Sequence, residues 1–479
     1  MTKNLHIDTK AMRAKILDLA IQGKLTDQRE EDCNARDLLK EIQAEKEKLI
    51  KEKKIKKEKK LPEIMEEEKT FDIPENWMWV RIGNIFTLQS GKSIKANEIS
   101  VKQYDEYRYP CFGGNGIRGY VKAFNREGDY PIIGRQGALC GNINFSSGKF
   151  YATEHAVVTD GYSKVNAYWA VIFLKALNLN QYATATAQPG LSVTKINTVL
   201  IPLPPLAEQN RIVGKVSALF AQLDSIDKAY EEYQELQQAM KSKLLDLAIQ
   251  GKLTDQRAED GNAQDLLKEI QAEKEKLIKE KKIKKEKPLP AITEEEKPFE
   301  IPKNWEWVRL GDLGAPIQYP FADGPFGSNL KKEHYTTNRE VRIIQLSNIG
   351  ENGWRDENVK YTTFEHLKLI SRSEVDPGDI VIAKMMPAGR AIIVPDKDPK
   401  YVLSSDAVKF VPNKHLYLPF VINCINSPVF QNQVTANVQG TTRKRTSLSK
   451  LKNCLLPIPP LAEQKRIVSK LDKLLSLEI

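Results

Sequence analysis

Apolar residues in the middle of the chain follow a helical period over an unusual length. Their spacing alternates between three and four residues, and Gln237 is the one polar member of the series: Val216, Leu219, Leu223, Ile226, Tyr230, Tyr233, Gln237, Met240, Leu244 and Leu247. This spacing predicts a coiled-coil seam. Pro204 and Pro205 favour a helix start and Gly251 favours its end. We therefore expect a helix of about 45 residues, roughly 68 Å long; one helix of an ordinary bundle core is the alternative.

Two other regions, 77–203 and 305–456, show a different pattern. Short apolar runs with strand character lie between glycine- and asparagine-rich turns, at 129–134, 154–159, 378–383 and 391–395. Each region ends with an apolar, helix-like segment (168–177 and 418–431), a glycine-containing loop and a last short strand. The pattern predicts two separate α+β domains, each with a curved sheet.

The chain also repeats itself. The segment LDLAIQGKLTDQR at 17–29 recurs letter for letter at 245–257, and the match extends from residues 11–81 to 239–309 at a constant offset of 228. The segment PPLAEQ at 204–209 recurs at 459–464, at an offset of 255. Solenoids have short periods and many copies, so this is one frame used twice around two different inserts. The predicted regions are 1–76 (helical), 77–203, 204–304 (with the long helix), 305–456 and 457–479 (a short helix).

The ends of the chain complete this pattern. In the alignment of the two copies, Ile479 matches Asp224 and Ala11 matches Ala239. Residues 225–238 fill the intervening gap in one copy, and residues 1–10 nearly fill it across the termini in the other. We expect the two ends to meet and to complete a second long helix in two pieces. The long helices would then be antiparallel, and the molecule would have a pseudo-two-fold axis.

The net charge of +10 comes almost wholly from two tracts. Residues 40–60 hold ten Lys and five Glu, and their repeat at 268–288 holds nine Lys and five Glu, so the rest of the chain is nearly neutral. Both tracts are rich in good helix formers. A thin apolar stripe of Leu38, Ile42 and Leu49 predicts light packing along the long helix, with the remaining face solvated. A face that contacts phosphates or a partner is the alternative.

Bulk features narrow the class of protein. The 479 residues allow two to four domains. The five cysteines are scattered without a CxxC pair, which argues against a zinc ribbon or a disulfide scaffold and fits a reducing cytosol. Neither a run of about 18 apolar residues nor the apolar core of a signal peptide is present. We expect a cytoplasmic protein without a membrane span.

Catalytic motifs are missing from the sequence. Residues 114–119 (GNGIRG) match G-x-G-x-x-G, but strand-like segments flank them on both sides, so we expect a glycine-rich loop between strands rather than a dinucleotide site. The sequence has no Walker motif and no Asn/Asp-Pro-Pro-aromatic tetrad, and it offers no metal site. Glu154 and His155 are expected to be a buried, hydrogen-bonded pair, because no nucleophile is placed with them.

Both inserts carry side chains able to read bases. Arg and Lys pair with guanine, and Asn and Gln with adenine, in the major groove. In the first insert the candidates are Lys92, Asn115, Arg118, Arg135 and Gln136. In the second they are Asn329, Lys331, Lys332, Gln345, Asn348, Lys384, Arg390, Arg443, Lys444 and Arg445. Their clustering on glycine-punctuated loops predicts contact with DNA.

Taken together, the chain resembles the specificity subunit of type I restriction–modification systems. The resemblance covers essentially the whole chain. It rests on the two PPLAEQ helix starts, the doubled LDLAIQGKLTDQR, the NWxWVR openings, YPCFGGNGIRGY with YPIIGRQGALCGNI and FYATEHAVV, and FADGPFGSNLK with VRIIQLSNIG. These motifs are weak singly and specific in combination.

The resemblance implies a non-catalytic component. Two target-recognition domains would each read half of a split double-stranded DNA sequence, while the helical regions dock two modification subunits and set the spacer. Those subunits would bind AdoMet and methylate adenine at N6, and restriction subunits would add ATP and Mg; this chain would hold no cofactor. A coiled-coil adaptor with protein-binding end domains and a self-contained enzyme are the alternatives.

Overall fold

The computed structural model describes residues 7–137, 139–184, 189–436 and 445–476. This part of the chain divides into two compact units, the first ending at residue 231 and the second beginning at residue 232. Within the described part of the chain, no helix is long and apolar enough to span a membrane.

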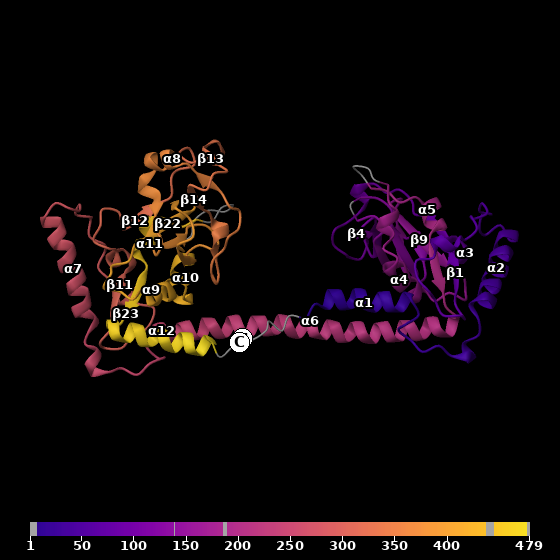
Figure 1. Ribbon diagram of the computed structural model, residues 1–479, viewed down its shortest axis with the longest axis horizontal. Helices are drawn as coiled ribbons and strands as arrows, with labels where there is room; N and C mark the ends of the chain where they lie inside the picture. Colours follow the sequence, from indigo (N-terminus) through magenta and orange to yellow (C-terminus); the bar gives the residue numbers. More distant parts are fainter. Residues whose placement is uncertain (1–6, 138, 185–188, 437–444, 477–479) are drawn as a thin grey trace. The chain divides into compact units, whose positions relative to one another are not determined.

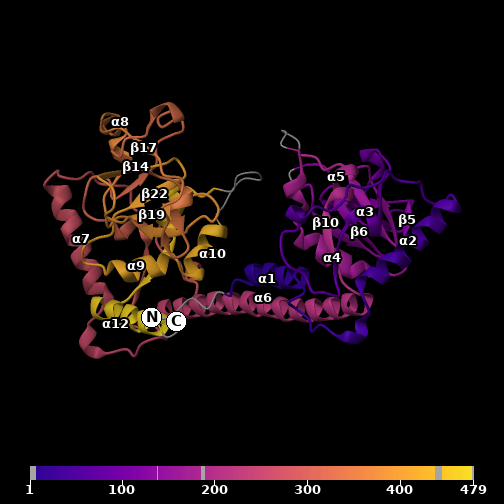
Figure 2. The ribbon, with the colours of Figure 1, turned by 45° about the vertical axis from the view of Figure 1, so that its right-hand side comes forward.

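The predicted long helix is present. Helix α6 covers Leu206–Ile249, 44 residues in all, and contributes to both units. In the first unit, α1 (Thr9–Ile21) lies beside it (Figures 1 and 2). Arg13 bonds Asp224 at 2.7 Å, and Gln28, beyond the end of α1, bonds Glu208 near the start of α6 at 2.7 Å. The order of these contacts makes the two helices antiparallel, as expected.

Burial along the predicted seam is uneven. Val216 and Leu223 are buried, whereas the side chains of Tyr233 and Met240 are about half exposed. The expected meeting of the chain ends concerns residues 1–6 and 477–479, which lie outside the described residues.

The same helical frame is built in each unit. The first contains α2 (Ala35–Lys51) and the strand pair β1 (Met78–Arg81) with β10 (Leu200–Leu203). The second contains α7 (Ala263–Lys279), β11 (Glu306–Arg309) with β23 (Leu455–Ile458), and α12 (Leu461–Ser476). Asn34 caps α2 and Asn262 caps α7, each by accepting a bond from the backbone two residues on.

The charged tracts behave differently from the prediction. Helices α2 and α7 end at Lys51 and Lys279, inside the tracts, where Lys53 and Lys281 adopt positive φ. Neither helix lies along α6 (Figure 1). Instead Lys46 donates to Gly83 O at 2.8 Å, because the buried side chains of α2 pack on the insert domain.

The first insert forms two sheets around a small apolar core. One sheet has the order β2-β9-β6-β7 and the other β4-β3-β8-β5. The bounds are β2 Phe86–Ser90, β3 Tyr109–Gly113, β4 Gly116–Val121, β5 Arg126–Glu127, β6 Tyr130–Gly134, β7 Ile143–Ser146, β8 Lys149–Ala152 and β9 Ala156–Gly161. The helices are α3 Ile82–Ile85, α4 Ala167–Ala176 and α5 Val193–Thr198. The loop predicted at 114–119 is shorter than expected, because residues 114 and 115 form the turn between β3 and β4 whereas residues 116–119 belong to β4.

The second insert also has two main sheets, ordered β12-β22-β19-β20 and β13-β17-β14-β21-β18. The strands are β12 Phe321–Asp323, β13 Tyr335–Thr336, β14 Val341–Ile344, β15 Ile349–Gly350, β16 Gly353–Trp354, β17 Tyr361–Thr362, β18 Glu374–Val375, β19 Ile380–Ala383, β20 Ala391–Ile393, β21 Lys400–Leu403 and β22 Ala407–Phe410. The helices are α8 Phe364–Leu369, α9 Leu418–Ile425, α10 Pro428–Ala436 and α11 Leu448–Asn453. The single helical segment expected at 418–431 is thus two helices.

The two inserts share one topology despite their different sequences. In the first, β9 pairs antiparallel with β2 and β6, and β3 runs parallel to β8. In the second, β22 pairs antiparallel with β12 and β19, and β14 runs parallel to β21. The added length of the second insert therefore lies outside this shared arrangement of strands.

Candidate nucleic-acid interface

Three segments of the first insert meet where its central strands end. One follows β2 at Gly91, one follows β6 at Arg135, and one precedes β9 at His155. Gly91 N donates to Ala156 O, and Arg135 N donates to His155 O, both at 3.0 Å. The strand ends thus bring together loops that lie far apart in the sequence.

Close backbone approach makes glycine necessary at this site. A Cβ on Gly91 would lie 2.0 Å from Ala152 O, and one on Gly134 would lie 1.9 Å from Gly114 O. No side chain fits at such distances, so these two glycines hold the β3–β4 hairpin and the strand-end loops against one another.

The predicted residues of the first insert lie on four parts of the chain: Lys92 follows β2, Arg135 and Gln136 follow β6, Asn115 lies in the turn between β3 and β4, and Arg118 lies on β4. Lys92, Gln136, Asn115 and Arg118 are exposed. Arg135 is half-buried, and its guanidinium donates to Ser90 Oγ at 3.1 Å. Cationic and amide groups therefore come from three segments, namely those after β2 and β6 and the β3–β4 hairpin.

The second insert builds the same junction from other side chains. Gly324 N donates to Ala407 O at 3.0 Å, and Lys384 N donates to Asp406 O at 2.8 Å. The Lys384 ammonium bonds the Asp323 carboxylate at 2.7 Å, and Arg445 forms an ion pair with Asp406.

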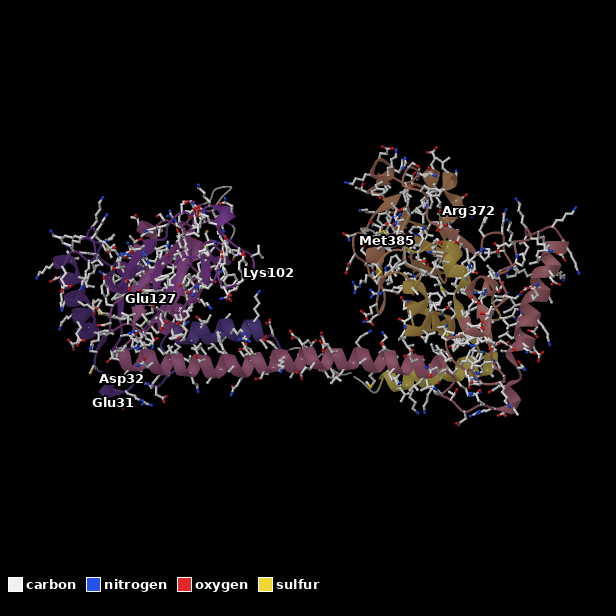
Figure 3. All side chains as sticks on the ribbon, turned by 180° about the vertical axis from the view of Figure 1, so that it is seen from behind. Glu31, Asp32, Lys102, Glu127, Arg372 and Met385 are labelled. Carbon is white, nitrogen blue, oxygen red and sulfur yellow. The ribbon has the colours of Figure 1, made fainter. Side chains whose placement is uncertain are left out.

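In each insert, a later segment of the chain bonds to the residue that follows the central strand. Leu191 N donates to Arg135 O and Thr446 N donates to Lys384 O, each at 2.9 Å. Met385, labelled in Figure 3, follows Lys384 as Gln136 follows Arg135. Strand register and these bonds pair the following positions: Ser90 with Asp323, Gly91 with Gly324, Arg135 with Lys384, Gln136 with Met385, Thr153 with Ser404, and His155 with Asp406.

The loop after β19 carries another predicted residue, Arg390. Gly389 N donates to Ala383 O, as Gly141 N donates to Gly134 O, and both glycines have φ near +90°. Arg390 follows this turn, is half-buried, and lies 3.9 Å from Glu351.

The remaining candidates of the second insert lie on separate segments of the domain. Asn329, Lys331 and Lys332 are exposed on the segment after β12. Gln345 follows β14, where its side chain bonds Asn358 O at 2.8 Å. Arg443 and Lys444 lie outside the described residues.

Asn348 is a correction to the predicted set. Its side chain is completely buried. The amide donates to Arg355 O at 2.9 Å and Glu357 O at 2.7 Å, and its oxygen accepts from Gln345 N at 2.8 Å. All these groups are used inside the domain, so Asn348 shapes a loop and cannot reach a base in this conformation.

The Glu154–His155 pair also differs from the expectation. The two side chains are 40% and 39% exposed rather than buried, with 3.4 Å between Glu154 Oε1 and His155 Nε2. Sequence reasoning missed their place among the loops, as it missed Ser90, Asp323 and Asp406. A signal existed in part, because Ser90 and Asp323 each directly precede a glycine.

A buried thiol, that of Cys111, lies near these loops. Burial raises the pKa of the nearby Cys111 thiol to about 11, so it is not a thiolate at neutral pH. Among the described residues no group of three His, Cys, Asp or Glu side chains could hold a metal ion. What the loops supply is hydrogen-bonding side chains on a fixed backbone.

Comparison with known proteins agrees with this arrangement. A family model described as "Type I restriction modification DNA specificity domain" matches residues 74–237 and 302–479. The EcoAI specificity subunit of a type I restriction enzyme from Escherichia coli is 29% identical, covering 97% of this chain and 89% of that protein. The EcoprrI specificity subunit, also from Escherichia coli, is 44% identical over 32% of this chain and 37% of its own length. A solved structure from a study of complex assembly and conformational transition of the type I R-M system is 16% identical, covers 85% of this chain and 92% of its own, and has a TM-score of 0.54.

Proposed function

Because the chain belongs to the family of type I restriction–modification DNA specificity domains, we propose that it gives such a complex its DNA sequence preference. Each insert domain would read one half of a split double-stranded target. The chain itself would be non-catalytic and would hold no cofactor.

One observation carries this proposal. Both inserts hold the same backbone junction, yet the side chains at equivalent positions differ in size, charge and hydrogen-bonding capacity: Arg135 and Lys384, Gln136 and Met385, His155 and Asp406. A shared scaffold with exchanged side chains is what two readers of different base sequences need, because sequence is read by side-chain contacts to base edges.

The duplicated frame supports docking of two like partners. Trp77, Glu208 and Arg211 have counterparts in Trp305, Glu463 and Arg466, which make the same contacts in the second unit. Two adenine-N6 methyltransferase subunits, each with its own AdoMet, would dock on the two copies. Restriction subunits with ATP and Mg would join through them, in the cytoplasm.

Helix α6 would set the spacing of the two half-sites. Its 44 residues correspond to about 66 Å at 1.5 Å per residue. A rigid helix shared by both units would fix a gap of several base pairs between the half-sites, since DNA rises about 3.4 Å per base pair.

The test is to co-express the chain with its methyltransferase subunit and sequence the host DNA for methylated adenines. A split motif with two defined halves and a fixed gap is the expected result. An assembled complex with AdoMet that methylates without any sequence motif would refute the proposal and favour the adaptor role.

A further inference from the structure

The loop Thr153–His155 lies at the centre of the first domain's junction. Thr153 N donates to Phe112 O at 2.9 Å, which anchors the loop to the end of β3. Gly91 contacts its backbone on one side, and Arg135 N bonds His155 O on the other. The loop therefore lies between the segments that carry Lys92 and Gln136.

Several polar atoms gather here without partners. Thr153 Oγ1, Glu154 Oε2, His155 Nδ1 and Arg135 Nε are buried and make no hydrogen bond within the described part of the chain. A buried polar atom without a partner costs free energy, and native proteins keep few of them. Three of these atoms belong to consecutive residues of the loop, and the fourth belongs to Arg135, whose backbone bonds His155, so this segment has unused capacity for a polar partner from outside the chain. Since the Glu154 and His155 side chains are each about 40% exposed, both can turn toward it.

The equivalent loop of the second domain has the same backbone and other chemistry. Ser404 N donates to Ile344 O at 2.9 Å, as Thr153 N does to Phe112 O. There the carboxylate comes from Asp406 and is paired with Arg445. The two loops thus share a backbone conformation but carry different side chains. This combination is expected of a segment that determines sequence specificity.

We propose that the Thr153–His155 loop reads a base pair of the first half-site through the Glu154 carboxylate. A carboxylate accepts hydrogen bonds and donates none, so its partner is the exocyclic amine of cytosine or adenine in the major groove. His155 Nε2 lies 3.4 Å from this carboxylate. Lys92 and Arg135 offset the repulsion between the carboxylate and the DNA phosphates. This assignment rests on the proposed function.

The test uses Glu154→Gln in the full chain, assembled with its methyltransferase subunits, with methylated adenines mapped by sequencing. Glutamine both accepts and donates, so we expect discrimination at one position of the first half-site to fall by about tenfold, equivalent to about 1.4 kcal/mol. The spacer and the second half-site should not change. Glu127→Gln on β5 (Figure 3) makes the same charge change in the same domain and should leave the motif as in the wild type.

An unchanged motif in Glu154→Gln would overturn the assignment while leaving the proposed function intact. Equal loss of methylation at all sites, with unchanged thermal unfolding, would also overturn it. If Glu154→Gln unfolds at a lower temperature than the wild type, His155→Gln is tested in its place. Discrimination at the same base position must then fall; if it does not, the loop does not contact that base. A wild-type complex that shows no split motif would instead refute the proposed function itself.

Discussion

The Trp77 indole donates a hydrogen bond to the Glu208 carboxylate at 2.7 Å, and both residues are buried. Trp305 and Glu463 repeat this contact in the second unit at 2.9 Å. The bond ties the start of each insert domain to the first turn of the helix that follows it. The repeated sequence thus forms the same joint, a Trp–Glu hydrogen bond between insert and helix, in both units. The two inserts that these joints hold differ in sequence.

This joint yields a stability prediction. Trp305→Phe should lower the free energy of unfolding of the second unit by about 1–3 kcal/mol, because the buried Glu463 carboxylate loses a donor. Trp307→Phe is the matched control, since its indole nitrogen is buried without a hydrogen-bond partner within the described residues. Urea unfolding followed by circular dichroism measures both. Equal losses in the two variants would mean that the Trp305 bond contributes nothing beyond packing.

A second prediction concerns acid stability. Arg211 hydrogen-bonds Asp32 at 2.6 Å and holds the pKa of that carboxyl below its usual value. The unfolded state then binds more protons, so this stabilisation is complete above the ordinary Asp pKa of about 3.8 and is lost as the pH falls through the lower, folded value. Arg211→Met should lower the free energy of unfolding by about 2–3 kcal/mol near pH 7, because the buried Asp32 carboxylate loses its charged donor.

The acid effect is checked by unfolding at a series of pH values. Relative to the wild type, Arg211→Met should flatten the dependence below pH 4, because the Asp32 carboxyl no longer has a depressed pKa. Lys40→Met breaks an exposed pair with Asp37 and should change neither property. An unaltered pH profile in Arg211→Met would contradict the account.

A third prediction tests base reading by the hairpin. Arg118→Ala should relax specificity at the first half-site alone, because Arg118 is exposed on the strand that leads away from the junction. Methylation mapping with the assembled complex is the measurement. A uniform fall in binding to all sequences, with a weaker salt dependence, would assign Arg118 to a phosphate instead.

A fourth prediction uses a matched pair of glycines. A Cβ on Gly324 would lie 1.7 Å from Ser404 O, whereas one on Gly327 meets nothing within 4 Å. Gly324→Ala should therefore abolish recognition of the second half-site and leave the first, while Gly327→Ala should be silent. Preserved recognition in Gly324→Ala would show that the junction does not position the reading loops.

A fifth prediction concerns the long helix. Inserting seven residues in the exposed stretch after Glu235 adds close to two helical turns, about 10 Å. The gap between half-sites should grow by about three base pairs, with both halves unchanged. Replacing Glu231 with Ala in the same stretch is the control. An unchanged gap would mean that α6 does not set the spacing.

The sequence predicted the frame well because its signals are local. The spacing of apolar residues located α6, and the repeat located two equivalent domains. The prediction for the charged tracts was wrong in part, because both helices end in a turn at Lys53 and Lys281, where φ is positive. Helix propensity alone does not reveal such a turn. The helix α2 packs on its domain rather than along α6, since tertiary burial of Leu38 and Ile42 decides its direction.

The site was harder to predict because its logic is not local. The residues Ser90, Arg135 and His155 meet only through the pairing of β2, β6 and β9. The equivalence of Arg135 with Lys384 is likewise invisible in sequences that do not align. Asn348 was a wrong choice because an exposed and a buried asparagine look alike in sequence, and only the surrounding carbonyl groups reveal its structural role.

The most direct measurement replaces residues 305–458 with a second copy of residues 77–203 and maps the methylated adenines. Since Trp77 matches Trp305 and Leu203 matches Ile458, the exchange joins Asn304 to Trp77 and Leu203 to Pro459, and the second frame keeps its own helices. We expect a split motif whose two halves are inverted copies of the wild-type first half-site. An assembled, active complex that still methylates the wild-type motif, or one with a single defined half, would contradict the claim that each domain reads its own half of the target.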